Sequence, residues 1–258
     1  MPKFAANLSM MFTEWDFLDR FAAAADAGFT AVEYLFPYDF SPDEIARRLA
    51  RHRLTQALFN LPPGDWSAGD RGTAAIPERA AEFRSSVGDA LVYAEATGVK
   101  RLHVMSGNAN SRDAKARAAY RDALRYATDL IGAQGLDVVI EPINSRDMPG
   151  YFLDDFDLAV ELIAALRNPR LKLQYDIYHR QVMRGDIVKS LDDLLPIIGH
   201  VQIASVPGRH EPGTGELNDD HIFRHLDAIG YQGFVGCEYR PAGATLAGLA
   251  WLNPWKTR

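Results

Sequence analysis

Cysteine is almost absent from this sequence: Cys237 is the only one in 258 residues, so no disulfide can form within the chain. We therefore expect a reducing compartment, the cytoplasm. No run of about 18 apolar residues occurs, which argues against a membrane-spanning helix. The N-terminal stretch also lacks a long apolar segment, and Glu14 and Asp16 come early in it, so a signal peptide is not expected.

Basic residues are too few for a general nucleic-acid surface. The 28 Lys and Arg are outnumbered by 34 Asp and Glu, which gives a formal net charge of −6. Binding to phosphate backbones needs a basic footprint, so we expect neither nucleic acid nor a membrane as a partner. One well-placed arginine would still be enough to hold a small anionic substrate.

What the sequence does contain is a strand-like run that repeats along the chain. Eight apolar runs rich in Val, Ile, Leu, Tyr and Phe are bounded by Gly, Pro, Asp or Asn, as strands are. They cover 4–10, 31–36, 54–60, 101–107, 137–143, 171–178, 200–205 and 234–239. Most are apolar on both faces, which fits parallel strands buried between helices.

The longer segments between these runs have the pattern of amphipathic helices, with apolar residues at steps of three and four. Three are clear: 77–97, 111–134 and 154–167. Pro77 is a good first-turn residue, and Ser111 is the expected N-cap of the second helix. Repeated strand–helix units in a chain of this length predict an α/β fold with a single (β/α)8 barrel domain over 1–258.

The alternative is an open doubly wound sheet. That fold usually has a Gly-rich turn after its first strand, and the sequence there, LSMMFTE, contains no glycine. Two long loops follow the third and seventh runs, over 61–77 and 206–219. Both lie after the C-terminal ends of strands, where barrel enzymes build their sites, so both are candidates for function.

Polar groups stand at the ends of four successive runs. They are Glu141, Asp176, Gln202 and Glu238, separated by 35, 26 and 36 residues. One strand–helix unit of such a barrel averages about 32 residues, so the four side chains are expected near one mouth, on strands five to eight. Three carboxylates and an amide oxygen are hard ligands that suit Mg²⁺ or Mn²⁺. Taken singly, each acid would more often be a polar strand end paired with a neighbour, but four such residues on successive strands favour a metal site.

Other residues near these ends have two interpretations each. His179 is either a packed residue or a hydrogen-bond partner of a substrate hydroxyl. Arg209 can hold a carboxylate bidentately or be an ordinary loop residue. Cys237 is expected to be a packed core residue rather than a nucleophile. Three further polar residues within the runs are candidates to shape the site: Glu33, Asn60 and His103.

The segments FAANLSMMFTE, VEYLFPYDF, LPPGDW with AGDRG, VIEPIN, LQYDIYHRQ, HVQIA, EPGTGE and VGCEYRP together resemble the hydroxypyruvate isomerase family. That family includes the 2-oxo-tetronate isomerases and lies within the xylose isomerase-like barrel superfamily. The resemblance implies that Glu141 and Glu238 are an acid/base pair. It also implies a divalent metal, Mg²⁺ or alternatively Mn²⁺, bound by Glu141, Asp176, Gln202 and Glu238.

A similar set of barrels, the ketose 3-epimerases, carries His where this chain has Gln202. The residues with which those enzymes hold substrate fall on His179 and Arg209 here. An acid six residues after their first catalytic Glu falls on Asp147, although the local sequence, SRDMPG, differs.

The activity implied is isomerisation of a small anionic hydroxy-keto acid through an enediolate. Hydroxypyruvate would give tartronate semialdehyde, or 2-oxo-tetronate would give 3-oxo-tetronate, and the segments MPKFAANLSMMFTE and LHVMSG favour the tetronate branch. Three alternatives stand beside it: a ketose 3-epimerase, an endonuclease-IV-like DNA phosphodiesterase and a non-catalytic binding protein. Trp251 and Trp255 indicate either an interface of a homo-oligomer or packing of the last helix onto the barrel.

Overall fold

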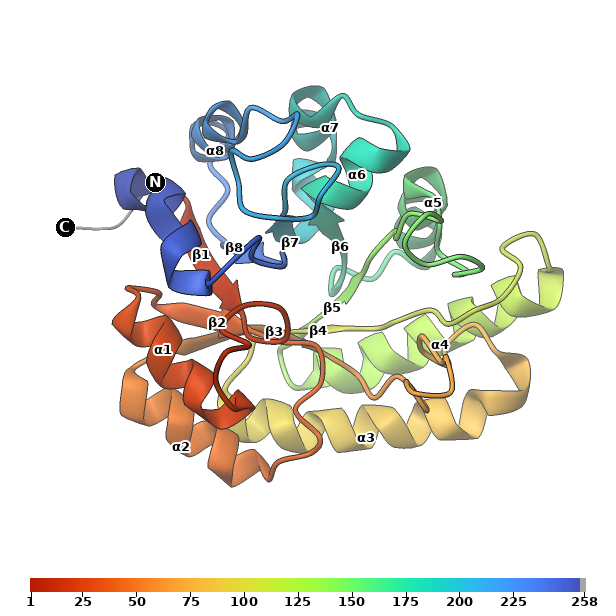
Figure 1. The fold of residues 1–258 in the computed structure, drawn as a ribbon. Coiled ribbons are helices and arrows are strands. Elements are labelled where there is room, and N and C mark those ends of the chain that lie inside the picture. Colours follow the sequence, from red (N-terminus) through yellow and green to blue (C-terminus); the bar gives the residue numbers. More distant parts are fainter. Residues whose placement is uncertain (256–258) are drawn as a thin grey trace.

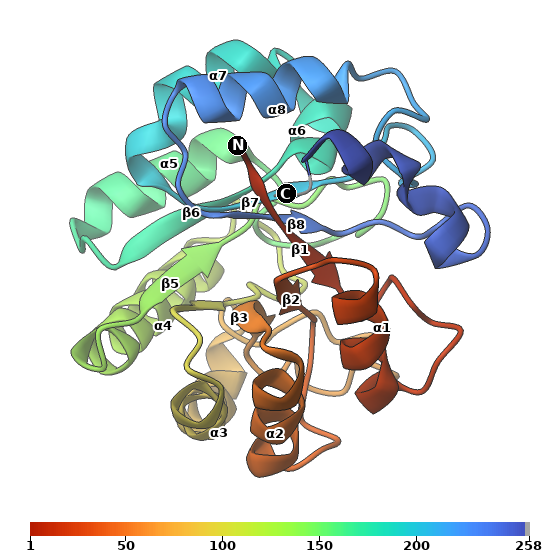
Figure 2. The same ribbon diagram turned by 90° about the vertical axis from the view of Figure 1, so that its left-hand side faces the viewer.

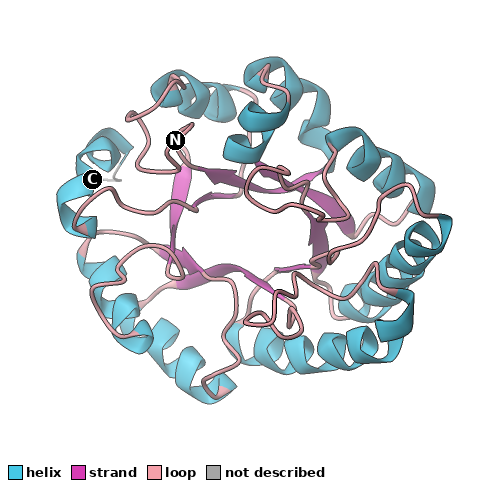
Figure 3. Ribbon diagram, turned by 45° about the vertical axis from the view of Figure 1, so that its right-hand side comes forward, coloured by secondary structure: helices cyan, strands magenta, loops and turns pink. Residues whose placement is uncertain are grey.

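Eight parallel strands close into a barrel in the computed structural model, which describes residues 1–255. The strands form a ring (Figure 3). They follow one another around it in chain order, and pairing of β1 with β8 closes it. The strands are β1 (Lys3–Asn7), β2 (Ala31–Glu33), β3 (Thr55–Asn60), β4 (Arg101–His103), β5 (Asp137–Ile140), β6 (Leu171–Asp176), β7 (Ile198–Ile203) and β8 (Phe234–Cys237). Each apolar run contributes one strand, so the predicted barrel is confirmed.

Helices surround the barrel on its outside (Figures 1 and 2). The α-helices are α1 (Arg20–Asp26), α2 (Pro42–His52), α3 (Ala80–Thr97), α4 (Ala114–Ala133), α5 (Phe156–Leu166), α6 (Ile177–Met183), α7 (Ile187–Leu194) and α8 (Asp219–Ala228). Four 3-10 helices join them: η1 (Phe17–Asp19), η2 (Pro77–Arg79), η3 (Leu195–Ile197) and η4 (Thr245–Trp255). No helix within residues 1–255 combines the length and apolar character needed to cross a bilayer.

One predicted helix start is wrong. The helix α4 begins at Ala114 and not near Ser111, because the side chain of Asp113 accepts a hydrogen bond from the Lys115 backbone N–H and caps the helix. Ser and Asp are equally good N-caps, so composition alone could not choose between two candidates so close in sequence. The helix expected over 77–97 is present as the short turn η2 followed by α3.

Several strands are shorter than the apolar runs that predicted them. Strand β5 ends before Glu141, and the next residue, Pro142, has no N–H with which to continue the ladder. Strand β4 ends at His103, and Ser106 beyond it instead forms an isolated bridge with Gly72 from the loop after β3. The apolar residues past these strand ends therefore build the walls of the barrel mouth.

The inside of the barrel combines very small residues with polar ones. Ala5, Ala31 and Ala57 form a small cluster separate from the main core, which lies between barrel and helices. Gly236 on β8 faces Glu33, and a Cβ at this glycine would clash with the Glu33 carboxylate. The small residues leave room for long polar side chains to reach across the barrel.

The two tryptophans near the C-terminus pack onto the barrel. The Trp251 ring lies edge-on to Phe4, with 5.1 Å between centroids, and the Trp255 ring lies edge-on to Phe223 at 5.6 Å. Offset and edge-on aromatic pairs of this kind add to the stability of a packed core. The structure therefore supports the packing interpretation of these residues over the interface interpretation.

Candidate active site

Polar residues at the ends of four neighbouring strands meet at one mouth of the barrel. Glu141 directly follows β5, Asp176 ends β6, Gln202 lies in β7, and Glu238 directly follows β8. All four side chains are buried. Parallel strands bring their C-terminal ends to the same rim of a barrel, so residues far apart in sequence become neighbours there.

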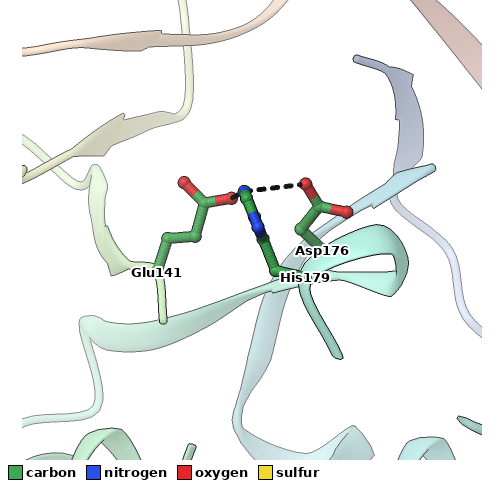
Figure 4. A group of neighbouring side chains, drawn as sticks. All are labelled: Glu141, Asp176 and His179. Carbon is green, nitrogen blue, oxygen red and sulfur yellow. Dashed lines mark ion pairs between the residues drawn. The ribbon is translucent and has the colours of Figure 1, made fainter. Parts of the chain in front are cut away.

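The tightest group at this mouth is Glu141, Asp176 and His179 (Figure 4). Each offers one possible ligand atom, and these atoms lie within 4.8 Å of one another. His179 comes from the first turn of α6, and its Nε2 lies 3.5 Å from Asp176 Oδ2 and 3.9 Å from Glu141 Oε1. The imidazole thus points its outer nitrogen at two buried carboxylates.

The tautomer of His179 follows from its neighbours. The backbone N–H of Asn144 donates to His179 Nδ1 over 3.4 Å, and the Asn144 side-chain nitrogen lies 2.6 Å from the same atom. Because a backbone N–H can only donate, Nδ1 is an acceptor and the proton lies on Nε2. Burial lowers the pKa of His179 well below its usual value, and the charge of Arg209 lowers it further. A neutral ring with Nε2–H facing the carboxylates suits a hydrogen-bond donor better than a metal ligand.

Arg209 connects the other acids to this group. It lies in the loop after β7, and its Nη2 is 3.3 Å from Glu238 Oε2 and 3.8 Å from Asp176 Oδ2. Its Nη1 is 3.6 Å from Asp147 Oδ2, and its guanidinium lies 4.9 Å from the centre of the Tyr178 ring. The structure therefore brings Asp147 and Glu238 to the same side of the mouth, with Arg209 between them.

Gln202 is fixed by buried groups beneath the mouth. Its Nε2 donates to Glu33 Oε1 at 2.8 Å, and its Oε1 accepts from Gln174 Nε2 at 2.7 Å. A carboxylate can only accept from this amide, so Glu33 sets which way the Gln202 oxygen points. Glu33 was expected to shape the site, and it does so from below, as the partner of Gln202.

Glu33 has two further partners inside the barrel. Asn7 Nδ2 donates to its Oε1 at 3.0 Å, and His200 Nε2 lies 2.6 Å from its Oε2. Sequence reasoning missed this network, although inward polar residues in otherwise apolar strands were a signal that could have found it. Its members come from strands on opposite sides of the ring, and the order of residues along the chain does not show that they meet.

Asn60 and His103 form the wall beside Glu141. His103 Nδ1 lies 3.1 Å from Asn60 Oδ1 and 3.9 Å from Glu141 Oε2. Burial lowers the pKa of His103 to about 3, with a smaller contribution from His200, so the ring is neutral. Cys237 is buried in the main core, and burial raises the pKa of its thiol, which fits its expected packing role.

Burial raises the pKa of three acids at the mouth: Glu141, Asp176 and Glu238. It raises the pKa of Glu238 to about 8 and that of Asp176 to about 6, although Arg209 opposes both shifts. It raises the pKa of Glu141 well above its usual value, and the charges of Glu238 and Asp176 raise it further. Crowded carboxylates in a low dielectric favour protonation unless a cation is present.

The free oxygen atoms at the mouth fit a divalent cation. Glu141 Oε1 and Asp176 Oδ2 are buried and have no hydrogen-bond partner among residues 1–255, and Glu238 Oε2 has only the long contact with Arg209. Buried polar atoms without partners are rare in proteins, and an ion is one explanation for them. Carboxylate oxygens converging with an amide oxygen are the ligands that Mg²⁺ and Mn²⁺ prefer.

A cavity of about 470 Å³ opens above these residues. Glu141, Asp147, His179, Arg209 and Glu238 all line it. Both of the long loops that the sequence marked for function contribute to its wall, the first through Trp66 and Arg71 and the second through Pro207, Gly208 and Arg209. A cavity of this size is large enough for a small organic acid.

The fold and this site together place the chain in a known class. Residues 21–255 match the model of the xylose isomerase-like TIM barrel family, and the chain belongs to that family. Within it, the chain is a member of the hydroxypyruvate isomerase family and is an isomerase.

Three similar proteins, two known by sequence and one by crystal structure, support this assignment. The chain is 52% identical to the 2-oxo-tetronate isomerase of Cupriavidus necator, with all of both chains covered. It is 44% identical to the hydroxypyruvate isomerase of Escherichia coli, over 99% of this chain and all of the relative. It also superposes with a TM-score of 0.97 and 51% identity, over the full length of both chains, on a crystal structure from Brucella melitensis described as an AP endonuclease, family 2.

Proposed function

We propose that this protein isomerises a small anionic hydroxy-keto acid through an enediolate, with Glu141 and Glu238 as the acid/base pair and a divalent metal at the barrel mouth. The observation that carries the proposal is the pair of buried glutamates that line one cavity and share it with an arginine. The protein would act as a cytoplasmic enzyme.

Glu141, Asp176, Gln202 and Glu238 would hold the metal, with Mg²⁺ expected and Mn²⁺ as the alternative. Such a cation polarises a substrate carbonyl and stabilises negative charge that develops on its oxygen. The buried carboxylate oxygens without partners support this assignment. The amide of Gln202 keeps a lone pair on Oε1 beyond the bond from Gln174, and Glu33 fixes its orientation.

Glu141 and Glu238 would move the proton between adjacent carbons of the substrate. One glutamate would remove the proton from the carbon next to the carbonyl, and a glutamate would return a proton to the former carbonyl carbon. The hydroxyl on the first carbon would lose its proton and become the new carbonyl, while the former carbonyl oxygen would take up a proton. A general base works best when its pKa lies near the operating pH, and burial raises the pKa of Glu238 to about 8. The raised pKa of Glu238 lets that group accept and release protons near neutral pH, and burial shifts the pKa of Glu141 in the same direction.

His179, Arg209 and Asp147 would bind the substrate around the reacting carbons. The Nε2–H of His179 faces the gap between Glu141 and Asp176, where it can donate to a substrate oxygen. Arg209 faces Glu238 and Asp147, where it would orient the acid/base group.

The substrate of choice would be 2-oxo-tetronate, with hydroxypyruvate as the second candidate. The C. necator relative that bears the tetronate name shares 52% of its residues with this chain, against 44% for the E. coli hydroxypyruvate isomerase. The two acids have the same carboxylate and keto group and differ only at the far end, so one site could accept both.

Proton NMR in D₂O tests the proposal. The enzyme with Mg²⁺ or Mn²⁺ is given 2-oxo-tetronate, hydroxypyruvate and a free neutral ketose in separate samples, each with a chelated control. We expect deuterium to enter a hydroxy-keto acid and exchange to stop on chelation. Epimerisation of the ketose would instead favour the 3-epimerase alternative, and exchange in none of the three would favour a binding protein.

A second candidate function comes from the description of the Brucella structure as an AP endonuclease. The site argues against it, because its tightest group holds one histidine with two carboxylates, and the net charge of −6 gives no basic surface for DNA. Retention on abasic DNA at low salt, followed by strand cleavage, would revive this alternative.

A further inference from the structure

The structure assigns a carboxylate anchor to Arg71, in the loop between β3 and α3. We infer that Arg71 binds the carboxylate group of the substrate and thereby selects acids over neutral ketoses of the same length. The inference rests on the proposed function, since it names the residue that recognises the anionic end of that substrate.

Three arginines line the cavity: Arg71, Arg209 and Arg240. The charge of Arg209 is already matched, because carboxylates of Asp147, Asp176 and Glu238 lie between 3.3 and 3.8 Å from its terminal nitrogens. A substrate carboxylate beside Arg209 would therefore meet three negative groups together with one positive group. Arg209 therefore suits orientation of the acids and contact with the reacting end of the substrate better than binding of the substrate carboxylate.

Arg71 has no such partner. Within residues 1–255, no carboxylate lies within 4.0 Å of the Arg71 guanidinium. The nearby carboxylates pair with other arginines, Asp70 with Arg79 and Glu238 with Arg209. Its Nη1 donates to two backbone carbonyls, Asp70 O at 2.6 Å and Trp66 O at 3.2 Å. Its remaining nitrogens make no hydrogen bond to the described part of the chain. A half-buried guanidinium on a cavity wall is thus left with free donors and an unmatched charge.

The guanidinium is also held in a fixed plane. Its central carbon lies 3.9 Å from the centre of the Trp66 ring, so the indole covers one face. Stacking on an aromatic ring favours Arg over Lys and leaves the edge with the N–H groups open. That edge is the geometry with which Arg grips a carboxylate through two parallel hydrogen bonds.

The backbone around Arg71 is braced against the barrel. Gly72 bridges to Ser106, its N–H donates to Pro63 O at 2.8 Å, and its φ of +104° is one that other residues rarely adopt. Asp70 on the other side pairs with Arg79 at 2.8 Å. Arg71 therefore needs little ordering when it binds an anion, and preorganisation of this kind increases affinity.

Arg240 offers a matched control. It lines the same cavity but is exposed, and no aromatic ring covers its guanidinium among the described residues. Its backbone, not its side chain, makes the local contacts, with its N–H donating to Arg209 O and its O accepting from His210 Nδ1.

The chemistry of the two candidate substrates fits one anchor. In both, the carboxylate is attached to the keto carbon, and only the opposite end differs in length. An anchor for the carboxylate would place the reacting carbons at the same position for either acid. A neutral ketose lacks the anionic group and would bind without this contact.

Steady-state kinetics of Arg71→Gln and Arg240→Gln with hydroxypyruvate and 2-oxo-tetronate test the assignment. We expect Arg71→Gln to raise KM roughly 10- to 100-fold, the range for loss of a charge-assisted hydrogen-bond pair, with a smaller change in kcat. Arg71→Lys should fall between wild type and Arg71→Gln, and Arg240→Gln should stay within about threefold of wild type. With 1,3-dihydroxyacetone, which has CH₂OH in place of the carboxylate of hydroxypyruvate, deuterium exchange should not differ between wild type and Arg71→Gln.

A calorimetric titration with glycerate separates this inference from the proposed function. Glycerate keeps the carboxylate but has no keto group, so it binds without turnover. Weaker glycerate binding in Arg71→Gln, with no such loss in Arg240→Gln, supports the anchor even if wild type isomerises neither acid. Unchanged KM and unchanged glycerate binding in Arg71→Gln overturn it. If Arg71→Gln loses as much activity on dihydroxyacetone as on the two acids, the inference is also overturned. That result would mean that Arg71 has only a structural role.

Discussion

Replacing Glu33 by alanine should destabilise the barrel strongly, because one buried carboxylate accepts from three side chains there. Asn7, His200 and Gln202 all lie 2.6 to 3.0 Å from its oxygens. A buried donor that loses its acceptor costs about 1–3 kcal/mol. Taking the lowest value for each of the three donors gives a loss of about 3 kcal/mol in the free energy of unfolding.

The matched variant is Glu33→Gln, which keeps the size of the side chain and one acceptor oxygen. That oxygen can still accept from Asn7 and Gln202, while the new amide can donate to His200 Nε2 in its other tautomer. That tautomer carries its proton on His200 Nδ1, which is buried and has no hydrogen-bond partner among residues 1–255. The buried N–H is then left without an acceptor. We therefore expect a loss of about 1 kcal/mol, well below that of Glu33→Ala.

Urea unfolding and calorimetric melting at pH 7 with EDTA measure both losses without a contribution from bound metal. For a chain of this size 1 kcal/mol corresponds to about 2–4 °C in Tm, so Glu33→Ala should melt about 6–12 °C below wild type. A Glu33→Ala protein within about 1 kcal/mol of wild type would refute the reasoning, since it would mean that the three donors find other acceptors. Equal losses in the two variants would mean that the negative charge of Glu33 matters and the number of acceptors does not.

Three further predictions concern the site and the first long loop. Glu238→Gln should lower kcat by about 10²- to 10⁴-fold and leave the melting temperature close to that of wild type, and NMR turnover above about a tenth of wild type would contradict an acid/base role. Burial raises the pKa of Glu238 to about 8 and that of Asp176 to about 6. Between about pH 4 and pH 8 the folded metal-free protein therefore holds protons that the unfolded chain has released. Its free energy of unfolding should fall as pH rises through this range. Added Mn²⁺ should then raise Tm more at pH 8 than at pH 6, and a metal-free Tm that falls no more steeply in wild type than in Glu238→Gln would count against the shift. In urea unfolding, Gly72→Ala should lower the free energy of unfolding more than Gly69→Ala does. Both glycines have φ near +100°, but only a Cβ at residue 72 would clash with Met105. Equal losses would show that the loop moves to relieve the clash.

The fold could be predicted from the sequence because strand and helix patterns are local. Each apolar run, six to eight residues long and bounded by turn residues, predicted one strand. The polar residues at the ends of runs five to eight predicted the rim of the site. The failures are also physical. Asp113 and Ser111 are equivalent as N-caps by residue type, and only the folded structure shows that Asp113 caps the helix.

Contacts across the ring and between loops could not be predicted from one sequence. Glu33 and Gln202 meet although 169 positions separate them, and no pattern in either strand names the other. Arg71 lies in a loop whose conformation is fixed by close approach of Gly72 to Met105, which is a property of the folded state. The proton on His179 Nε2 follows only from the position of the Asn144 backbone N–H.

The site draws its acids from β5 to β8, while the loop that carries Trp66 and Arg71 belongs to the other half of the barrel. The proposed acid/base and metal-binding residues therefore all come from the C-terminal half of the chain, and the proposed recognition loop comes from the N-terminal half. A change of substrate could then arise by altering residues 61–77 alone, without disturbing any of the four strand-end residues. Transplanting that loop between members of the family should carry substrate preference with it and leave the reaction type as it was.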